Sequence, residues 1–146
     1  MTITVYGTPA PQGSKRFVGI KGGRGVMIES SKAVKPWREA VKCAALDAMP
    51  PGSPWYQIAG PIRVRMVFTL PKPKSAPKGR ITYPDRKPDL SKLVRATEDA
   101  LTDAGVWEDD ARVIECVAVK AYPIIPHVPG TMILDRPGCV IEIEAA

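Results

Sequence analysis

The side chains best suited to chemistry in this sequence are carboxylates that stand around one expected helix. Asp89 stands at the start of that helix, and Asp109 and Asp110 stand between its end and the next expected strand. Carboxylates at a helix start and a strand start can converge on one hard cation, which favours Mg²⁺, with Mn²⁺ as a substitute. Lys92 and Arg95 lie on the polar side of the same helix and could stabilise added charge or a leaving oxygen. The set predicts metal-assisted cleavage of a phosphodiester.

Each of these residues also has a purely structural interpretation. Asp89 would be a natural helix N-cap, and an acidic pair such as Asp109-Asp110 is common in turns. The combination favours a site, because a basic loop stands directly before Asp89 and would bring a phosphate to the acids. Carboxylates that lie close together also favour a cation between them, since like charges repel.

The helix that positions these acids, at about residues 89–103, is the clearest element in the sequence. Its apolar stripe consists of Leu90, Leu93, Val94, Thr97 and Leu101. Ala104-Gly105 ends the helix. Residues 71–88 contain five prolines and many Lys and Arg residues, and we expect there a loop that becomes ordered on a ligand.

Further periodic segments predict the rest of the fold. Apolar alternation predicts strands at residues 2–7 and 61–70, a central strand at 113–120 and a last strand at 140–144, with a proline-rich excursion at 123–137. A first helix should run from residue 32 or 36 to 48, capped by Ser30 and Ser31. Its core face should consist of Val34, Trp37, Val41 and Ala45. We predict an α+β fold, a single domain over residues 1–146 in which two main helices pack on a small mixed β-sheet.

Composition narrows the class of protein. A chain of 146 residues with 45% apolar content is enough for one core. It has no run of eighteen apolar residues and no signal-peptide pattern at Met1, so we expect no membrane contact and a cytoplasmic location. Cys43, Cys116 and Cys139 fit no zinc spacing, and we interpret them as buried free thiols in a reducing compartment. The single histidine, His127, argues against a His-based metal site or a catalytic triad.

Charge is unevenly distributed along the chain. The formal net charge is +6, but residues 61–98 hold ten Lys/Arg against three acids, whereas residues 99–146 hold three against nine. A solvated surface of mixed sign would also look like this, but a basic front with an acidic rear favours a bound polyanion. The sequence Lys21-Gly-Gly-Arg24, flanked by 14–18 and 25–28, predicts a basic hairpin whose glycines allow close approach of phosphates. The predicted DNA contacts are Lys15, Arg16, Lys21, Arg24, Arg80, Arg86 and Lys87.

The same residues resemble a known family. The pattern Pro84-Asp85-Arg86, Asp89-Leu90-x-x-Leu93-x-Arg95-Ala96, Asp99-Ala100-Leu101-Thr102-x-Ala104-Gly105-x-Trp107-x-Asp109-Asp110-Ala111-x-Val113 resembles the core of the RusA family of Holliday junction resolvases. The specific match covers about residues 84–120, and Pro9-x-Pro11-x-Gly13-Ser14-Lys15-Arg16 agrees more loosely. The resemblance implies a RusA-like fold and a small, dimeric, Mg²⁺-dependent endonuclease of bacteria or phages that acts on four-way DNA. A homodimer also suits a substrate with two-fold symmetry.

The resemblance assigns roles to individual residues. It implies that Asp89 is the first metal-binding aspartate and that Asp110 is the metal-binding aspartate after the helix, with Asp109 as its neighbour. Two positions depart from the family pattern, because Ser91 stands in place of an aspartate and Arg95 in place of a catalytic lysine.

These departures suggest substitutes within the chain. Arginine cannot donate a proton at neutral pH, so Lys92, one turn earlier on the same side, could take that role. Asp109, Asp85 or Asp99 could supply the carboxylate that is missing at position 91.

Three functions compete. The leading hypothesis is a structure-selective endonuclease that resolves four-way junctions by paired nicks. The alternative is a branched-DNA-binding protein of the same fold that has lost cleavage through the changes at Ser91 and Arg95. A PD-(D/E)xK nuclease is weaker, because neither Pro84-Asp85 nor Pro88-Asp89 is followed by an acid-x-Lys on a strand.

Overall fold

The computed structural model describes residues 1–13, 15–29, 32–51 and 58–146. Its main sheet has four strands in the spatial order β1-β6-β4-β5. The strands are β1 (Thr2–Tyr6), β4 (Ile62–Thr69), β5 (Val113–Ala121) and β6 (Gly138–Ala145). β4 and β5 are parallel, whereas β6 pairs antiparallel with both β1 and β4. The sheet is therefore mixed, as the sequence predicts.

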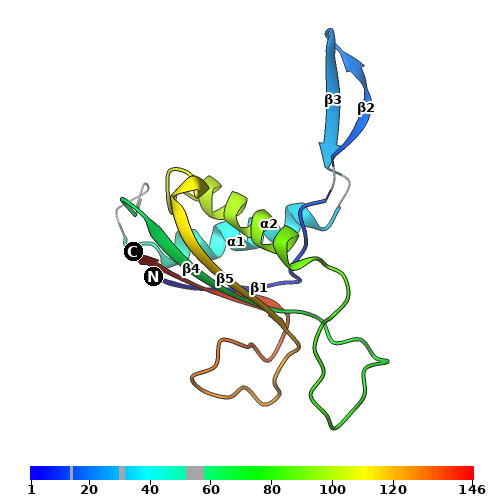
Figure 1. The fold of residues 1–146 in the computed structure, drawn as a ribbon, viewed down its shortest axis with the longest axis vertical. Coiled ribbons are helices and arrows are strands. Elements are labelled where there is room, and N and C mark those ends of the chain that lie inside the picture. Colours follow the sequence, from blue (N-terminus) through cyan, green and yellow to red (C-terminus); the bar gives the residue numbers. More distant parts are fainter. Residues whose placement is uncertain (14, 30–31, 52–57) are drawn as a thin grey trace.

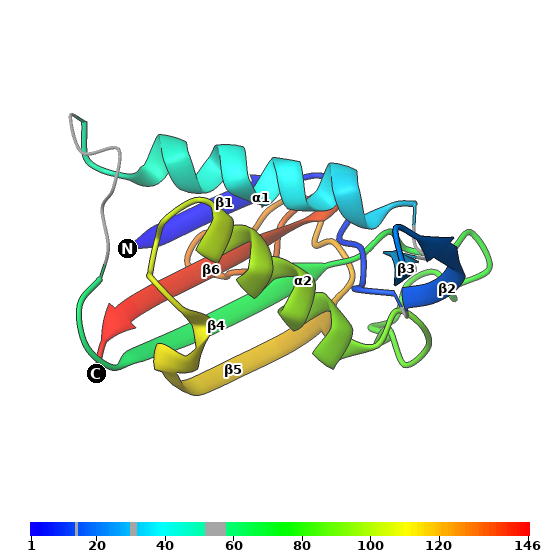
Figure 2. The same ribbon diagram turned by 90° about the horizontal axis from the view of Figure 1, so that it is seen from above.

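Both helices cover one face of this sheet (Figures 1 and 2). α1 (Val34–Ala48) and α2 (Leu90–Asp103) lie side by side, with α2 above the edge formed by β4 and β5. The core between helices and sheet contains the predicted helix stripes and the apolar residues of β4, among them Trp37, Leu93, Leu101 and Phe68. The α+β fold with two main helices on a small mixed sheet is thus confirmed.

A polar link inside the core holds the two helices together. The indole Nε1 of Trp37 in α1 donates a hydrogen bond to Oγ1 of Thr97 in α2, at 3.2 Å. The Thr97 hydroxyl in turn donates to the carbonyl oxygen of Leu93, at 2.9 Å. Thr97 can therefore be fully buried, since both roles of its hydroxyl are satisfied.

A separate hairpin projects away from the body (Figure 1). It consists of β2 (Lys15–Lys21) and β3 (Arg24–Glu29), and we call it the arm. Gly22 and Gly23 form its tip with φ values of 61° and 77°, a conformation that glycine adopts without strain. The predicted basic hairpin is therefore confirmed.

The sequence-based prediction for the start of the first helix needs revision. Ser30 and Ser31, the predicted caps, lie outside the described residues. α1 begins after Ala33, which makes no side-chain cap hydrogen bond. Pro36 lies in the first turn, where its missing N–H has no helical partner to lose.

The prediction that residues 113–120 form a central strand is wrong, because within the described chain β5 lies at the edge of the main sheet. β6 returns between β1 and β4 and takes the central position instead. Val117 and Val119 share the sheet face of Arg65, away from the helices, and are 45% and 42% exposed, and Ile114 near the start of β5 is 63% exposed. A run of β-branched residues is typical of a buried strand, but only long-range pairing decides which strand is central.

The cysteine prediction is also wrong for two of the three thiols. Cys139 is buried, as expected, in β6. Cys43 is exposed on α1, because it lies off the stripe that faces the sheet, and Cys116 is exposed because β5 is an edge strand.

Two long segments leave the sheet at the end where β4 and β5 finish. Residues 71–89 and 122–137 form neither helices nor strands, in agreement with the sequence prediction. The Lys120 ammonium donates hydrogen bonds to the carbonyl oxygens of Arg86 and Pro88, at 2.9 and 3.0 Å, and so fixes the end of the first segment to β5. In the described parts of the chain no helix is both long and apolar enough to span a membrane.

Candidate functional site

Asp89 stands where the basic loop meets α2. It occupies the N-cap position with extended backbone angles, φ −66° and ψ 132°, but its carboxylate makes no cap hydrogen bond. Instead its Oδ2 lies 3.7 Å from the ammonium of Lys92, and both side chains are about half exposed. The capping interpretation of Asp89 therefore lacks its characteristic hydrogen bond, and the carboxylate is accessible to a ligand.

The turn after α2 is fixed by buried side chains. Trp107 is buried, and its Nε1 donates a 2.8 Å hydrogen bond to Thr102 Oγ1. Gly105 has a φ of 79°, and the Val106 N–H donates to the Leu101 carbonyl oxygen at 3.1 Å. The chain is thereby turned back along α2, which leaves residues 108–110 exposed beside the helix.

The two paired acids have different surroundings. Asp109 caps the short 3-10 helix η1 (Asp110–Arg112), and its Oδ1 accepts a 2.7 Å hydrogen bond from the Ala111 N–H. Asp110 is the first residue of η1 and is exposed. Asp109 thus has a demonstrated structural role, whereas Asp110 presents its carboxylate to solvent.

Asp109 and Asp110 belong to an acidic pocket of about 200 Å³ at the C-terminal half of α2. Asp99, Asp103 and Glu108 also line this pocket. Arg38 of α1 compensates part of the negative charge, because its Nη2 donates to Asp103 Oδ2 at 2.8 Å and its Nη1 lies 4.0 Å from Asp99 Oδ2. Asp99 is therefore near Asp110 but already partly paired.

Glu98 is a carboxylate that the sequence analysis missed. Burial raises its pKa, and the negative charges of Asp110 and Asp99 raise it further, while Arg95 lowers it. Cys116 of β5 lies on the same side, and its pKa is raised by burial and by the Glu98 charge. The sequence could have indicated Glu98 by its position, because Glu98 is one turn after Arg95 on the face of α2 that the chain approaches after the helix ends.

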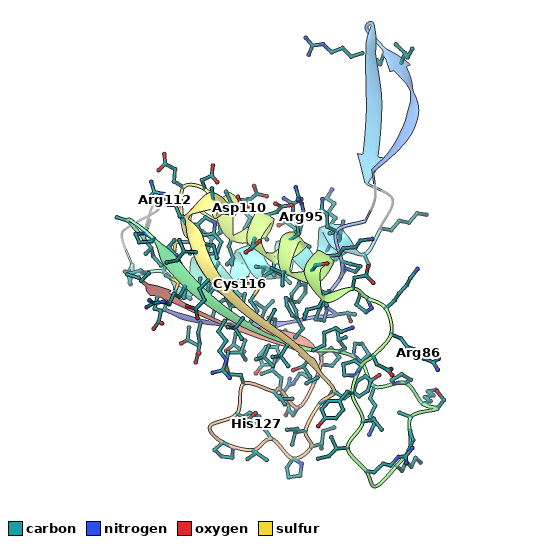
Figure 3. All side chains as sticks on the ribbon, in the orientation of Figure 1. Arg86, Arg95, Asp110, Arg112, Cys116 and His127 are labelled. Atoms are coloured by element: carbon teal, nitrogen blue, oxygen red, sulfur yellow. The ribbon has the colours of Figure 1, made fainter. Side chains whose placement is uncertain are left out.

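The predicted ligands do not converge within one chain. Asp89 begins α2, whereas Asp109 and Asp110 lie beside its C-terminal half, and a helix of 14 residues is about 21 Å long. Figure 3 agrees, with Asp110 and Arg112 far from Arg86 on the loop before α2. Among the described residues, no three His, Cys, Asp or Glu side chains are grouped to hold a metal ion. The metal role of these aspartates stays a prediction.

The predicted DNA contacts fall into two regions. Arg80, Arg86 and Lys87 are exposed on the loop before α2. Lys21 and Arg24 are exposed at the tip of the arm, while Lys15 and Arg16 lie in β2 with side chains outside the described part. The structure thus presents exposed cations next to Asp89 and on a projecting hairpin.

Two comparisons with known proteins bear on the family of this chain. A search of curated proteins found no match to this chain. The family model described as endodeoxyribonuclease RusA matches residues 7–144, which include α1, α2, η1 and most of the main sheet. Because the match spans nearly the whole chain, the protein belongs to the RusA endodeoxyribonuclease family, whose activity is the resolution of DNA junctions.

Proposed function

We propose that this protein is a Mg²⁺-dependent endodeoxyribonuclease that resolves four-way DNA junctions by paired nicks, acting as a homodimer. The observation that carries the proposal is the exposed, uncapped carboxylate of Asp89, which stands beside Lys92 directly after the basic loop. A phosphate attracted by Arg86 and Lys87 would arrive at this carboxylate, where a divalent ion would be needed to offset the repulsion between the two negative groups.

The donor atoms present suit Mg²⁺. Asp89 and Asp110 offer exposed carboxylate oxygens, which are the ligands that Mg²⁺ prefers together with water. Such an ion supplies polarisation of the scissile phosphate and lowers the pKa of a bound water. Mn²⁺ takes the same type of ligand and would be a substitute.

The protein's own cations have distinct roles in this proposal. Lys92 lies 3.7 Å from Asp89, so it is placed to stabilise charge at the same phosphate and to protonate a leaving oxygen. Arg95 is one turn further along α2, toward Glu98, and a guanidinium group binds phosphate oxygens through several N–H donors. We therefore assign to Arg95 phosphate binding.

A homodimer could bring together acids that lie at different positions along α2 within one chain. β5 is an exposed edge of nine residues, and exposed edges are templates for pairing with another strand. Antiparallel pairing of two β5 strands about a two-fold axis would place the two α2 helices on the same face and in opposite directions. Asp89 of one protomer would then approach Asp110 of the partner subunit. We propose that each metal site is shared in this way.

The sequence offers three replacements for the carboxylate missing at position 91, and the structure adds Glu98 as a fourth. Asp99 is partly neutralised by Arg38, and Asp109 already accepts a backbone hydrogen bond, whereas Glu98 lies near Asp110, with Arg95 as a cation that lowers its pKa. Asp85 lies on the loop before Asp89 and makes no contribution near Asp110. We propose Glu98 as the replacement on the Asp110 side.

The binding-only alternative is supported by Ser91 and Arg95, which lack the groups that the family pattern has at these positions. It predicts tight junction binding with no cleavage under any Mg²⁺ or Mn²⁺ condition. A single cleavage assay on one junction substrate therefore distinguishes the two functions.

Asp110→Asn and Asp89→Asn test the site. Each change removes one charge and keeps the size of the side chain, so cleavage should fall by orders of magnitude while junction binding persists. Asp103→Asn is the matched control, because it removes an acid from the same pocket that is paired with Arg38. Loss of a mere helix cap at Asp89 would instead cost about 1 kcal/mol of stability with little change in rate. Normal cutting by both variants would show that the metal site is misplaced.

A further inference from the structure

The loop before α2 encloses a second pocket that the catalytic proposal does not use. Its volume is about 800 Å³, and we call it the loop pocket. Arg80, Thr82, Tyr83 and Arg86 line it from the loop, and Tyr122 lines it from the residue after β5. Pockets of a few hundred to a thousand Å³ are of a size that holds small ligands or their parts.

The exposed side chains of this pocket are unusual for a loop. Tyr83 is 75% exposed and Ile81 is 83% exposed, although both are large and apolar. Tyr122 is half-buried against the core, so its ring has a fixed support. An exposed aromatic ring and a supported one that line the same pocket offer planar surface on which a flat, uncharged group can stack.

The charges around the loop pocket indicate the class of ligand. Residues 71–88 contain a single acid, Asp85, among many Lys and Arg residues. The guanidinium groups of Arg80 and Arg86 can bind phosphate or stack on a planar ring. Aromatic rings interleaved with cations are typical of surfaces that bind single-stranded nucleic acid.

We propose that the loop pocket binds an unpaired nucleobase of the DNA substrate, with the base stacked on the Tyr83 ring. The inference rests on the proposed function for its DNA ligand, and it names the part of the junction that is recognised. Tyr83 lies six residues before Asp89, and Lys120 ties the intervening chain to β5 through Arg86 and Pro88. A base held here would therefore belong to a nucleotide close to the scissile phosphate.

The test uses a four-way junction of synthetic oligonucleotides that carries 2-aminopurine at positions around the strand exchange, in buffer with EDTA. Wild-type protein should change the fluorescence at one or more of these positions, and Tyr83→Ala should abolish the change. Junction affinity of Tyr83→Ala should fall at least about fivefold, because base–aromatic stacking carries free energy of this order. Affinity for an intact duplex should stay the same, and Tyr83→Phe should behave as the wild type.

Lys78→Ala is the matched control on the same loop, where Lys78 is exposed and lies outside the pocket lining. It should weaken junction and duplex binding alike and reduce the salt dependence, whereas Tyr83→Ala should leave the salt dependence unchanged. The inference is overturned if Tyr83→Ala keeps the fluorescence change or loses affinity equally for duplex and junction.

The outcome of the Tyr83 test can be distinguished from the outcome of the cleavage test for the proposed function. Wild type that never cuts but shows the Tyr83-dependent signal would contradict the nuclease and support the base pocket. Equal cutting and equal binding by wild type and Tyr83→Ala would do the reverse.

Discussion

A mixed dimer of two inactive variants should regain activity if each site is shared between protomers. Asp89→Asn removes the helix-start carboxylate and Asp110→Asn removes the carboxylate beside the C-terminal half of α2. In a dimer of one Asp89→Asn chain and one Asp110→Asn chain, one shared site carries both substitutions and the other carries neither. If each site used acids of one chain, both sites would be damaged.

The expected magnitude follows from the symmetry. Random exchange of subunits gives about half mixed dimers, each with one intact site of two, so about a quarter of the wild-type sites should return. Isolating the mixed dimer with two different tags raises this to about half. Because only one strand can be cut per binding event, the products should be single nicks instead of resolved duplexes.

The assay is cleavage of a four-way junction labelled on each strand in turn, with Mg²⁺ present. Each variant alone should be inactive, and so should a mixture of Asp89→Asn with the double variant. Absence of recovery in a verified mixed dimer would refute the shared site. It would also leave no explanation for the distance between the two aspartates.

Three other outcomes are expected. About six phosphate contacts from the loop and the arm should give a slope near −5 for log affinity against log salt concentration, and a slope near zero would remove the argument from the basic face. Val117→Arg on the exposed edge of β5 should convert a dimer of about twice 15.8 kDa into a monomer by light scattering, whereas Arg63→Lys on neighbouring β4 should not. In EDTA at pH 7, Glu98→Gln should raise the melting temperature, because the raised pKa means that the charged carboxylate destabilises the folded state. That difference should shrink as the pH falls through the raised pKa and vanish below about 4.5, where Glu98 is protonated in both states.

Much of the fold was predictable from short-range patterns. The apolar stripes of α1 and α2 define which helix faces are buried, and Trp37, Leu93 and Leu101 lie where that spacing places them. Gly22-Gly23 and Gly105 mark the hairpin tip and the helix end, because glycine adopts the positive φ that both positions have. These features depend on neighbours within a few residues, which is why they can be predicted from the sequence.

The order of the strands was not predictable in the same way. Val113–Ala121 has the composition of a central strand but lies at the edge, because β6, from the far end of the chain, inserts between β1 and β4. Pairing over such a separation is decided by the whole fold. Val117 and Val119 lie on the sheet face away from the helices and are exposed, and their residue type does not distinguish core burial from an interface.

The candidate site, like the fold, was predictable only in part from the sequence. That Asp89 and Asp110 flank α2 was evident from the sequence, but their convergence was assumed from types and order alone. The rise of the helix keeps them apart, and the same packing brings Glu98 to Asp110. Composition could not show that Asp109 would accept the Ala111 N–H or that Asp89 would leave its cap role unfilled.

The most direct test of the proposed function is cleavage of a mobile four-way junction, with the nicks mapped on all four strands. With Mg²⁺ the wild-type protein should make paired, symmetric nicks that yield ligatable duplexes, and with EDTA it should bind the junction without cutting it. Tight binding with no nicks in either Mg²⁺ or Mn²⁺ would contradict the nuclease and establish the binding-only alternative.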